Sequence, residues 1–84
     1  MKLTLYGKEH CSLCTDAYHI LEMLQQDFLF EIEEVDIYNE DELLEAFHLM
    51  IPVLKDQETV IDTGIIDIQT VENYLLSKNN SENS

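Results

Sequence analysis

The sequence predicts an α/β protein in which helices cover both faces of a four-stranded mixed sheet, with the element order βαβαββα. Three observations support this fold class. The chain has 84 residues, which suffice for one domain. Hydrophobic residues make up 45% of it, enough for a packed core. Segments with the alternating period of strands are interspersed along the chain with segments that have the period of helices.

The first three elements predict a parallel unit. Residues 2–6 alternate polar and apolar side chains as strands do, and Gly7 marks the end of this strand. Residues 30–37 place β-branched residues among acids and predict a second strand, in which the slipped alternation at residues 33–34 allows a bulge. A right-handed crossover is expected to join the two strands. It is an amphipathic helix over residues 13–28, with apolar positions at Leu13, Ala17, Ile20, Leu21, Leu24 and Phe28.

The second half of the chain predicts a helix, a hairpin and a last helix. Asn39 is suited to cap a helix over residues 39–50, and Asp67 to cap a helix over residues 68–78. The apolar runs 51–54 and 59–61 predict an antiparallel hairpin. The folded domain is expected to span residues 1–76, followed by a disordered polar tail over residues 77–84. The helix residues expected to face inward are Leu43, Leu44, Phe47, Met50, Ile68, Val71, Tyr74 and Leu75.

The charge balance limits the partners of the protein. The chain has 18 Asp and Glu residues against 4 Lys and no Arg, for a formal net charge of −14. A nucleic acid needs clustered cations to displace its counterions, so we expect no nucleic-acid partner, and anionic membranes are disfavoured for the same reason. The acidity indicates a well-hydrated surface, or steering toward a protein partner with a basic surface.

The sequence shows no signal peptide and no apolar run long enough to span a membrane. We therefore expect a cytoplasmic monomer. Structural disulfides are rare in the cytosol, and a bridge between residues three apart removes little chain entropy. The two cysteines are thus not expected to be a structural crosslink.

The stretch GKEHCSLCTD at residues 7–16 holds both cysteines, Cys11 and Cys14, between the first predicted strand and the first predicted helix. A Cys-x-x-Cys pair in that place is a redox arrangement. Cys11 falls at the helix N-terminus, where unpaired N–H groups and the dipole favour a thiolate, so we expect it to attack. Cys14, nearly one turn further on, is expected to resolve the mixed disulfide. A protonated His10 would further favour the thiolate, whereas Glu9 would oppose it.

Two other readings of the cysteines remain open. A zinc-binding module would need Cys11 and Cys14 together with two of the three histidines, but the chain has no second Cys-x-x-Cys pair and no His-x-x-x-His pair, so no metal ligands are assigned. A catalytically inert interaction module could also retain the two cysteines, because a fold does not by itself imply an activity.

Three segments carry a resemblance to a known family: YGKEHCSLC at 6–14, IPVL at 51–54 and TGIID at 63–67. The chain resembles a glutaredoxin-like member of the thioredoxin superfamily, over residues 2–76. The resemblance implies a three-layer thioredoxin-like fold. It also implies a thiol-disulfide oxidoreductase that reduces protein disulfides or glutathione mixed disulfides and is itself reduced by glutathione or a thioredoxin reductase. No bound cofactor is expected, and glutathione is the implied co-substrate.

The resemblance also implies substrate-binding residues. Pro52 is expected to be cis and to lie against the cysteine pair, leaving the backbone of Ile51 free to pair with an extended substrate. Lys8 occupies the place of a lysine that meets a glutathione carboxylate. Gly64 and Asp67 match part of a turn that holds the glutamyl end of glutathione, although Asp67 can equally be a helix cap. The first glycine of that turn is replaced by Thr63.

Overall fold

The computed structural model describes the backbone of residues 1–82 and the side chains of residues 1–78. It confirms the predicted order of strands and helices and adds one 3-10 turn, η1. The elements are β1 (Lys2–Gly7), α1 (Ser12–Leu24), β2 (Glu31–Asp36), η1 (Ile37–Asn39), α2 (Asp41–Phe47), β3 (Val53–Asp56), β4 (Thr59–Thr63) and α3 (Ile68–Glu82).

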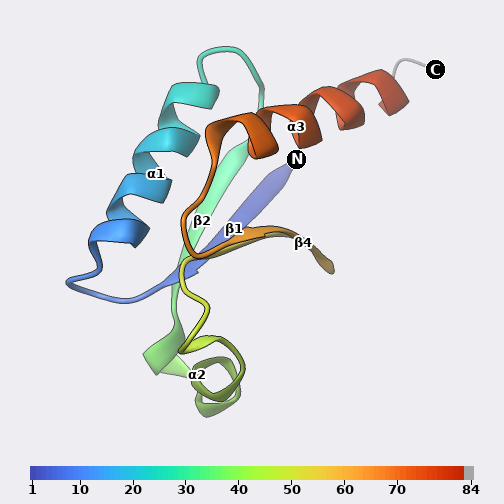
Figure 1. Ribbon diagram of the computed structural model, residues 1–84. Coiled ribbons are helices and arrows are strands. Elements are labelled where there is room, and N and C mark those ends of the chain that lie inside the picture. Colours follow the sequence, from blue (N-terminus) through green and yellow to red (C-terminus); the bar gives the residue numbers. More distant parts are fainter. Residues whose placement is uncertain (83–84) are drawn as a thin grey trace.

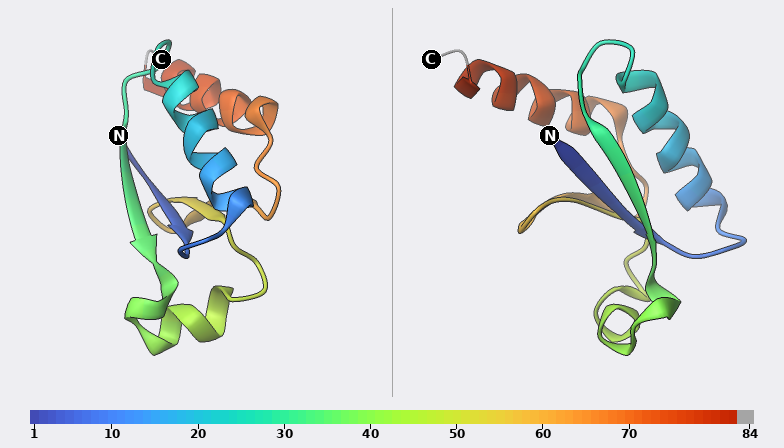
Figure 2. Two further views of the ribbon diagram at one scale, coloured as in Figure 1. Left: turned by 90° about the vertical axis from the view of Figure 1, so that its left-hand side faces the viewer. Right: turned by 180° about the vertical axis from the view of Figure 1, so that it is seen from behind.

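The four strands form one mixed sheet in the order β2-β1-β3-β4, as the fold class predicts. β1 pairs parallel with β2, and the pairs β1–β3 and β3–β4 are antiparallel. Helices α1 and α3 contact each other on one face of the sheet. Helix α2 lies beyond one end of the strands (Figures 1 and 2). Phe47 of α2 reaches Tyr6 of β1, with the ring centroids 5.1 Å apart. Because side chains alternate along a strand, Tyr6 lies on the face opposite Leu5, so α2 reaches the second face only at the end of the sheet.

The core lies between the sheet and the pair of helices α1 and α3. Leu3 and Leu5 of β1 are almost fully buried there and meet the apolar stripes of both helices. Burial of these stripes is the main driving force that holds the helices on the sheet. The buried cluster comprises Leu3, Leu5, Ala17, Leu21, Leu24, Phe30, Leu54, Ile66, Val71 and Leu75.

Helix α1 is shorter than predicted, because it ends at Leu24 rather than at Phe28. The chain turns there: the Phe28 N–H still donates to the Leu24 carbonyl at 2.9 Å, and the Gln25 side chain donates to the Phe30 carbonyl at 3.0 Å. Phe28 nevertheless packs against the core. At the other end of the predicted stripe, Leu13 is 40% exposed.

The strands differ from the prediction in where the sheet is irregular. β2 has no bulge at residues 33–34, because its pairing with β1 continues without a shift from Glu31 to Asp36. β2 is an edge strand, which explains why it tolerates so many acids. The register instead shifts in the hairpin, between Leu54 and Lys55. The hairpin turn contains Gln57, whose φ of 54° lies in the left-handed region.

The predicted cap of α2 is wrong, and the predicted inward face is only partly buried, at Leu43, Leu44 and Phe47. Asn39 lies inside η1, since the Asp36 side chain accepts a 2.9 Å hydrogen bond from the Tyr38 N–H and starts a turn earlier. The N-cap of α2 is Glu40, which makes no side-chain capping bond. No residue of α2 is buried, because this seven-residue helix packs only at the end of the sheet. Met50, expected to face inward, is 41% exposed.

Helix α3 is capped by Asp67 as predicted, but it continues through residues 77–82, where the sequence predicts a disordered tail. Val71 and Leu75 are buried, whereas Ile68 is 39% exposed because it lies in the first turn. The last two positions of the predicted tail, residues 83–84, lie outside the described residues. Among the helices of residues 1–82, none is long and apolar enough to cross a membrane.

Candidate redox site

The two cysteines lie where α1 begins. Cys11 is the N-cap residue of α1, with the extended backbone angles φ −115° and ψ 106°, and Cys14 is in the first turn. A disulfide joins them, with their Cα atoms 5.2 Å apart, within the range that disulfides require. The predicted position of Cys11 at the helix N-terminus is therefore confirmed, and the three-residue spacing lets the two sulfur atoms bond.

The backbone around Cys11 favours negative charge on its sulfur. The Cys14 N–H donates to the Cys11 Sγ at 3.2 Å. Thr15 holds the same turn, because its N–H and its hydroxyl both donate to the Cys11 carbonyl, at 3.1 and 3.2 Å. In the reduced protein the same N–H group and the helix dipole would stabilise a thiolate at Cys11.

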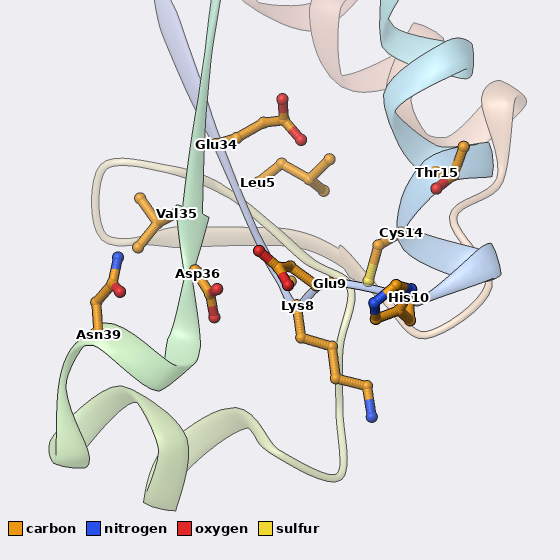
Figure 3. A pocket seen from close by; sticks show the side chains of 11 residues that line it. Leu5, Lys8, Glu9, His10, Cys14, Thr15, Glu34, Val35, Asp36 and Asn39 are labelled. Atoms are coloured by element: carbon orange, nitrogen blue, oxygen red, sulfur yellow. The ribbon is translucent and has the colours of Figure 1, made fainter.

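Both cysteines are half-buried, and a cavity of about 450 Å³ opens beside Cys14 (Figure 3). Its wall combines the end of β1, the loop that leads to Cys11, the first turn of α1, and β2 with η1. Cys14, rather than Cys11, lines this cavity. The lining residues are Leu5, Gly7, Lys8, Glu9, His10, Cys14, Thr15, Glu34, Val35, Asp36 and Asn39.

The charges around the cavity are mostly negative. Lys8 is the one lysine among the lining residues, and three carboxylates share the wall with it. An anionic ligand that entered here would meet Lys8 but also the field of these carboxylates. The lining carboxylates are those of Glu9, Glu34 and Asp36.

His10 lies in the cavity wall with a backbone that side-chain-bearing residues rarely adopt. Its φ of 56° is in the left-handed region, which costs a non-glycine residue about 1–2 kcal/mol. This turn directs the imidazole to the cavity that Cys14 lines, as Figure 3 shows. The effect of His10 on Cys11, expected from their adjacency in sequence, stays a prediction.

The loop before β3 holds two of the expected substrate-binding residues, Ile51 and Pro52. The Ile51–Pro52 peptide bond is cis, and Pro52 is buried. Gly64 is tied to this loop, since its N–H donates to the carbonyls of Pro52 and Met50 at 2.8 and 3.1 Å, and its φ of 73° suits a glycine. The backbone of Ile51 is not entirely free, however, because its N–H donates to the Phe47 carbonyl at 3.1 Å. Of the two backbone groups of Ile51, the carbonyl is the one that has no hydrogen-bond partner among the described residues.

The sheet register brings this loop toward the cysteines. The last paired residues of β1 and β3 are Tyr6 and Val53, so the next position along each strand is Gly7 and Pro52. Gly7 leads into the cysteine loop. The cavity beside Cys14, by contrast, includes Lys8 and His10 but neither Pro52 nor Gly64. The predicted site residues therefore form two groups, one at the cavity and one at the proline loop.

Asp67 acts as the cap of α3. Its Oδ2 accepts hydrogen bonds from the N–H and the hydroxyl of Thr70, at 3.1 and 2.9 Å. Its own N–H donates to the Asp62 side chain at 2.9 Å. The helix-cap interpretation is thus confirmed, and a role for Asp67 in glutathione binding stays a prediction.

Gly7 is a residue of the site that the sequence analysis treats only as the end of a strand. A Cβ atom built on Gly7 would lie 2.9 Å from the Sγ and 3.2 Å from the Cβ of Cys14. The Cys14 sulfur therefore packs against the backbone at the end of β1. A glycine at a strand end four residues before the first cysteine is the signal that could have indicated this contact.

No group of three or more His, Cys, Asp and Glu side chains that could hold a metal ion occurs among the described residues. His19 contacts the Glu22 carboxylate at 3.2 Å, and His48 lies 2.9 Å from the Leu44 carbonyl. His19 therefore contacts a residue of its own helix, α1, and His48 contacts a residue of α2, at whose end it lies.

The fold and the cysteine pair together define a glutaredoxin-like protein with a thioredoxin-like fold. Within this class, residues 2–77 match the family model Glutaredoxin-like domain (DUF836). The chain belongs to this glutaredoxin-like family, as its motifs predict. No curated protein matches the chain.

Solved structures support the same assignment. The solution structure of protein Ne2328 from Nitrosomonas europaea is 30% identical, with a TM-score of 0.78 over 88% of this chain and 89% of that one. Protein XcR50 from X. campestris is 29% identical, with a TM-score of 0.72 over 89% of this chain and 96% of that one. Thioredoxin 1 from Thermosipho africanus, 22% identical with a TM-score of 0.60 over 94% and 99% of the two chains, shares the fold.

Proposed function

We propose that the protein is a thiol-disulfide oxidoreductase that uses the Cys11–Cys14 dithiol to reduce protein disulfides or glutathione mixed disulfides. The observation that carries the proposal is the cap of α1, where the Cys11 Sγ accepts the Cys14 N–H and is within bonding reach of the Cys14 sulfur. One sulfur is thereby activated for attack and the other is in place to displace it.

The reaction runs in two exchanges. The Cys11 thiolate attacks one sulfur of the target disulfide, forming a mixed disulfide, and the other target sulfur leaves as a thiolate that takes up a proton. Cys14 then loses its proton and attacks the Cys11 sulfur, which releases the second target thiol and leaves the Cys11–Cys14 disulfide. Two electrons pass to the target. Glutathione or a thioredoxin reductase would supply two further electrons to the Cys11–Cys14 disulfide, in a reducing compartment such as the cytoplasm.

Substrate contacts are assigned to the proline loop. The free carbonyl of Ile51 would accept a hydrogen bond from a backbone N–H of an extended substrate segment. The substrate would thereby pair with the loop as an added strand pairs with a sheet edge. Pro52 and the adjoining Gly64 would hold the loop that presents this carbonyl. Exposed apolar side chains on the neighbouring segments would contact an apolar substrate surface. They are Leu13, Met50 and Ile65, with exposed fractions of 40%, 41% and 77%.

Protein disulfides are the favoured substrate class. Glutathione would rely on Lys8, Gly64 and Asp67, yet Lys8 shares its cavity with three carboxylates and Asp67 is engaged as a helix cap. Glutathione carries net negative charge, so the acidic surface opposes its binding. A protein partner with a basic surface would be attracted by the same charges.

Two cysteine variants test the proposal. We expect Cys11→Ser to abolish disulfide reduction, because the remaining thiol, Cys14, lacks the N–H hydrogen bond that favours a thiolate at Cys11. Cys14→Ser should lose turnover on insulin disulfides and accumulate the mixed disulfide at Cys11, because the resolving sulfur is missing. The assay is run once with glutathione and once with a thioredoxin reductase as electron source, which identifies the reductant. Full turnover of Cys14→Ser on insulin without glutathione would refute the dithiol mechanism.

A further inference from the structure

Gly7 occupies a strand position that does not need the conformational freedom of glycine. It is the last residue of β1 and is in register with Asp36 of β2. Of the two glycines in the chain, only Gly64 has a positive φ. A glycine weakens a strand relative to residues with a side chain, so another property must explain its presence.

The missing side chain makes room for Cys14. A Cβ atom at Gly7 would lie 2.9 Å from the Cys14 Sγ and 3.2 Å from the Cys14 Cβ. Non-bonded carbon atoms pack best at about 3.5–4.0 Å, and sulfur is larger than carbon. An alanine therefore could not be accommodated while Cys14 keeps its position in the disulfide. No such neighbour exists at Gly64, where a Cβ atom would meet nothing within 4 Å.

We propose that Gly7 is a positioning residue that sets the reduction potential of the Cys11–Cys14 pair, by leaving space for the Cys14 sulfur in the position that the disulfide requires. The inference rests on the proposed redox function. It adds a residue of β1, outside the Cys-x-x-Cys motif but in contact with Cys14, to the residues that decide how readily this pair is oxidised.

The two redox states differ in how freely the Cys14 sulfur can move. In the disulfide it is bonded to Cys11 and is held against the end of β1. In the dithiol it can rotate about the Cα–Cβ bond into another rotamer. A methyl group at position 7 would therefore penalise the disulfide more than the dithiol. The longer contact, the one of 3.2 Å to the Cys14 Cβ, is present in both states and cancels from the equilibrium between them.

The same contact bears on the resolving step. To displace the substrate, the Cys14 sulfur must approach the Cys11 sulfur, which brings it to its position in the disulfide beside Gly7. A methyl group there opposes this approach. A mixed disulfide at Cys11 should therefore persist longer in Gly7→Ala than in the wild type.

The test is the dithiol-disulfide equilibrium of Gly7→Ala and wild-type protein in defined mixtures of reduced and oxidised dithiothreitol. The fractions are read by acid quenching, alkylation and mass spectrometry. We expect the Gly7→Ala equilibrium to move about tenfold toward the dithiol, which makes the potential less negative by about 30 mV. The lifetime of the mixed disulfide, measured on the same samples after mixing with a substrate disulfide, should lengthen in parallel.

Val71→Ala is the matched control. Val71 is fully buried in α3, so the substitution lowers global stability without touching the cysteines. Its dithiol-disulfide equilibrium should equal that of the wild type. An unchanged equilibrium in Gly7→Ala, or an equal shift in Val71→Ala, would overturn the inference while leaving the redox function intact. If the Cys11–Cys14 pair of the wild type does not exchange with the dithiothreitol buffers at all, both the inference about Gly7 and the proposed redox function are overturned.

A double-mutant cycle keeps the inference testable if Gly7→Ala folds poorly. Gly7→Ala is introduced into oxidised wild-type protein and into Cys14→Ala, and each product is compared with its own Gly7 parent by urea denaturation. Cys14→Ala removes the sulfur that lies 2.9 Å from the added methyl group. The substitution should therefore destabilise Cys14→Ala less than the oxidised wild type. Equal destabilisation in both backgrounds would show that the sulfur contact is not the reason for the glycine.

Discussion

Asp67 illustrates how one carboxylate can fit two roles in this family. The sequence allows it to cap α3 or to bind the glutamyl end of glutathione. In the structure, its Oδ2 accepts both hydrogen bonds from Thr70. An amide oxygen can accept the same bonds, whereas only a carboxylate carries charge. Substitution by Asn and by Ala therefore separates the two roles.

We predict that Asp67→Ala lowers the free energy of unfolding by about 1 kcal/mol, the usual cost of a lost helix cap. Asp67→Asn should leave it nearly unchanged, because the cap is retained. Urea denaturation measures both values. Stability of Asp67→Ala equal to the wild type would contradict the capping role. A raised KM for glutathione in Asp67→Asn, with stability unchanged, would assign the carboxylate to the ligand instead.

The sequence predicts correctly that Cys11 and Asp67 lie at helix N-termini, because their environment there is local. The helix cap at Cys11 and the cap at Asp67 depend on groups three residues away, which the sequence itself supplies. Ile51 is different, because its N–H is occupied through the way α2 ends at Phe47. Gly7 is different as well, since its role depends on how the loop folds back to bring Cys14 against β1.

Helix α3 is joined to the hairpin by one short hydrogen bond. The Tyr74 hydroxyl donates to the Asp56 carboxylate of β3 at 2.6 Å. Partial burial of the phenol, and then this hydrogen bond, raise the pKa of Tyr74 to about 12. The Lys78 ammonium lies 5.7 Å from the centre of the Tyr74 ring, a contact that a phenylalanine would also make. Tyr74→Phe therefore removes only the hydroxyl.

We predict that the wild type is more stable than Tyr74→Phe by about 1–2 kcal/mol at neutral pH, because a hydrogen bond to a charged acceptor is lost. The pKa of Tyr74 is higher in the folded state than the usual value of about 10. Its contribution is therefore fully present below pH 10 and is lost as the pH rises from about 10 to about 12. Urea denaturation of both proteins across this range measures the difference. A difference that stays constant up to pH 12 would contradict the raised pKa of Tyr74 in the folded protein, and no difference at neutral pH would contradict the stabilising role of the hydroxyl.

The long elements are predictable from the sequence because their patterns repeat. The stripe of Ala17, Leu21 and Leu24 extends over several turns, and all three residues are buried as an amphipathic helix requires. Helix α2 is too short for such a repeat, and the competing cap at Asp36 moves its start. Helix ends depend on bonds outside the helix, such as the one from Gln25 to the Phe30 carbonyl, which periodicity does not reveal.

At the scale of the whole molecule, the charge is strongly one-sided. The formal net charge of −14 is spread over a chain of 84 residues, and of its four lysines Lys2 pairs with Glu33 at 2.7 Å. That hydrogen bond to Glu33 raises the pKa of Lys2. Lys8, the lysine of the cavity, is surrounded by carboxylates. A disulfide substrate that approaches the cysteines therefore diffuses through a negative field, which accelerates cationic partners and slows anionic ones.

We predict that the rate constant for reduction of a basic protein disulfide falls about tenfold as salt rises, because the added ions screen the steering field. The rate for hydroxyethyl disulfide, which carries no charge, should not change, and the rate for anionic oxidised glutathione should rise. Stopped-flow measurement of Cys11–Cys14 oxidation at several salt concentrations gives the three slopes. The uncharged substrate controls for any effect of salt on the thiolate itself. Equal slopes for the basic and the uncharged disulfide would mean that the charge serves solubility rather than the choice of substrate.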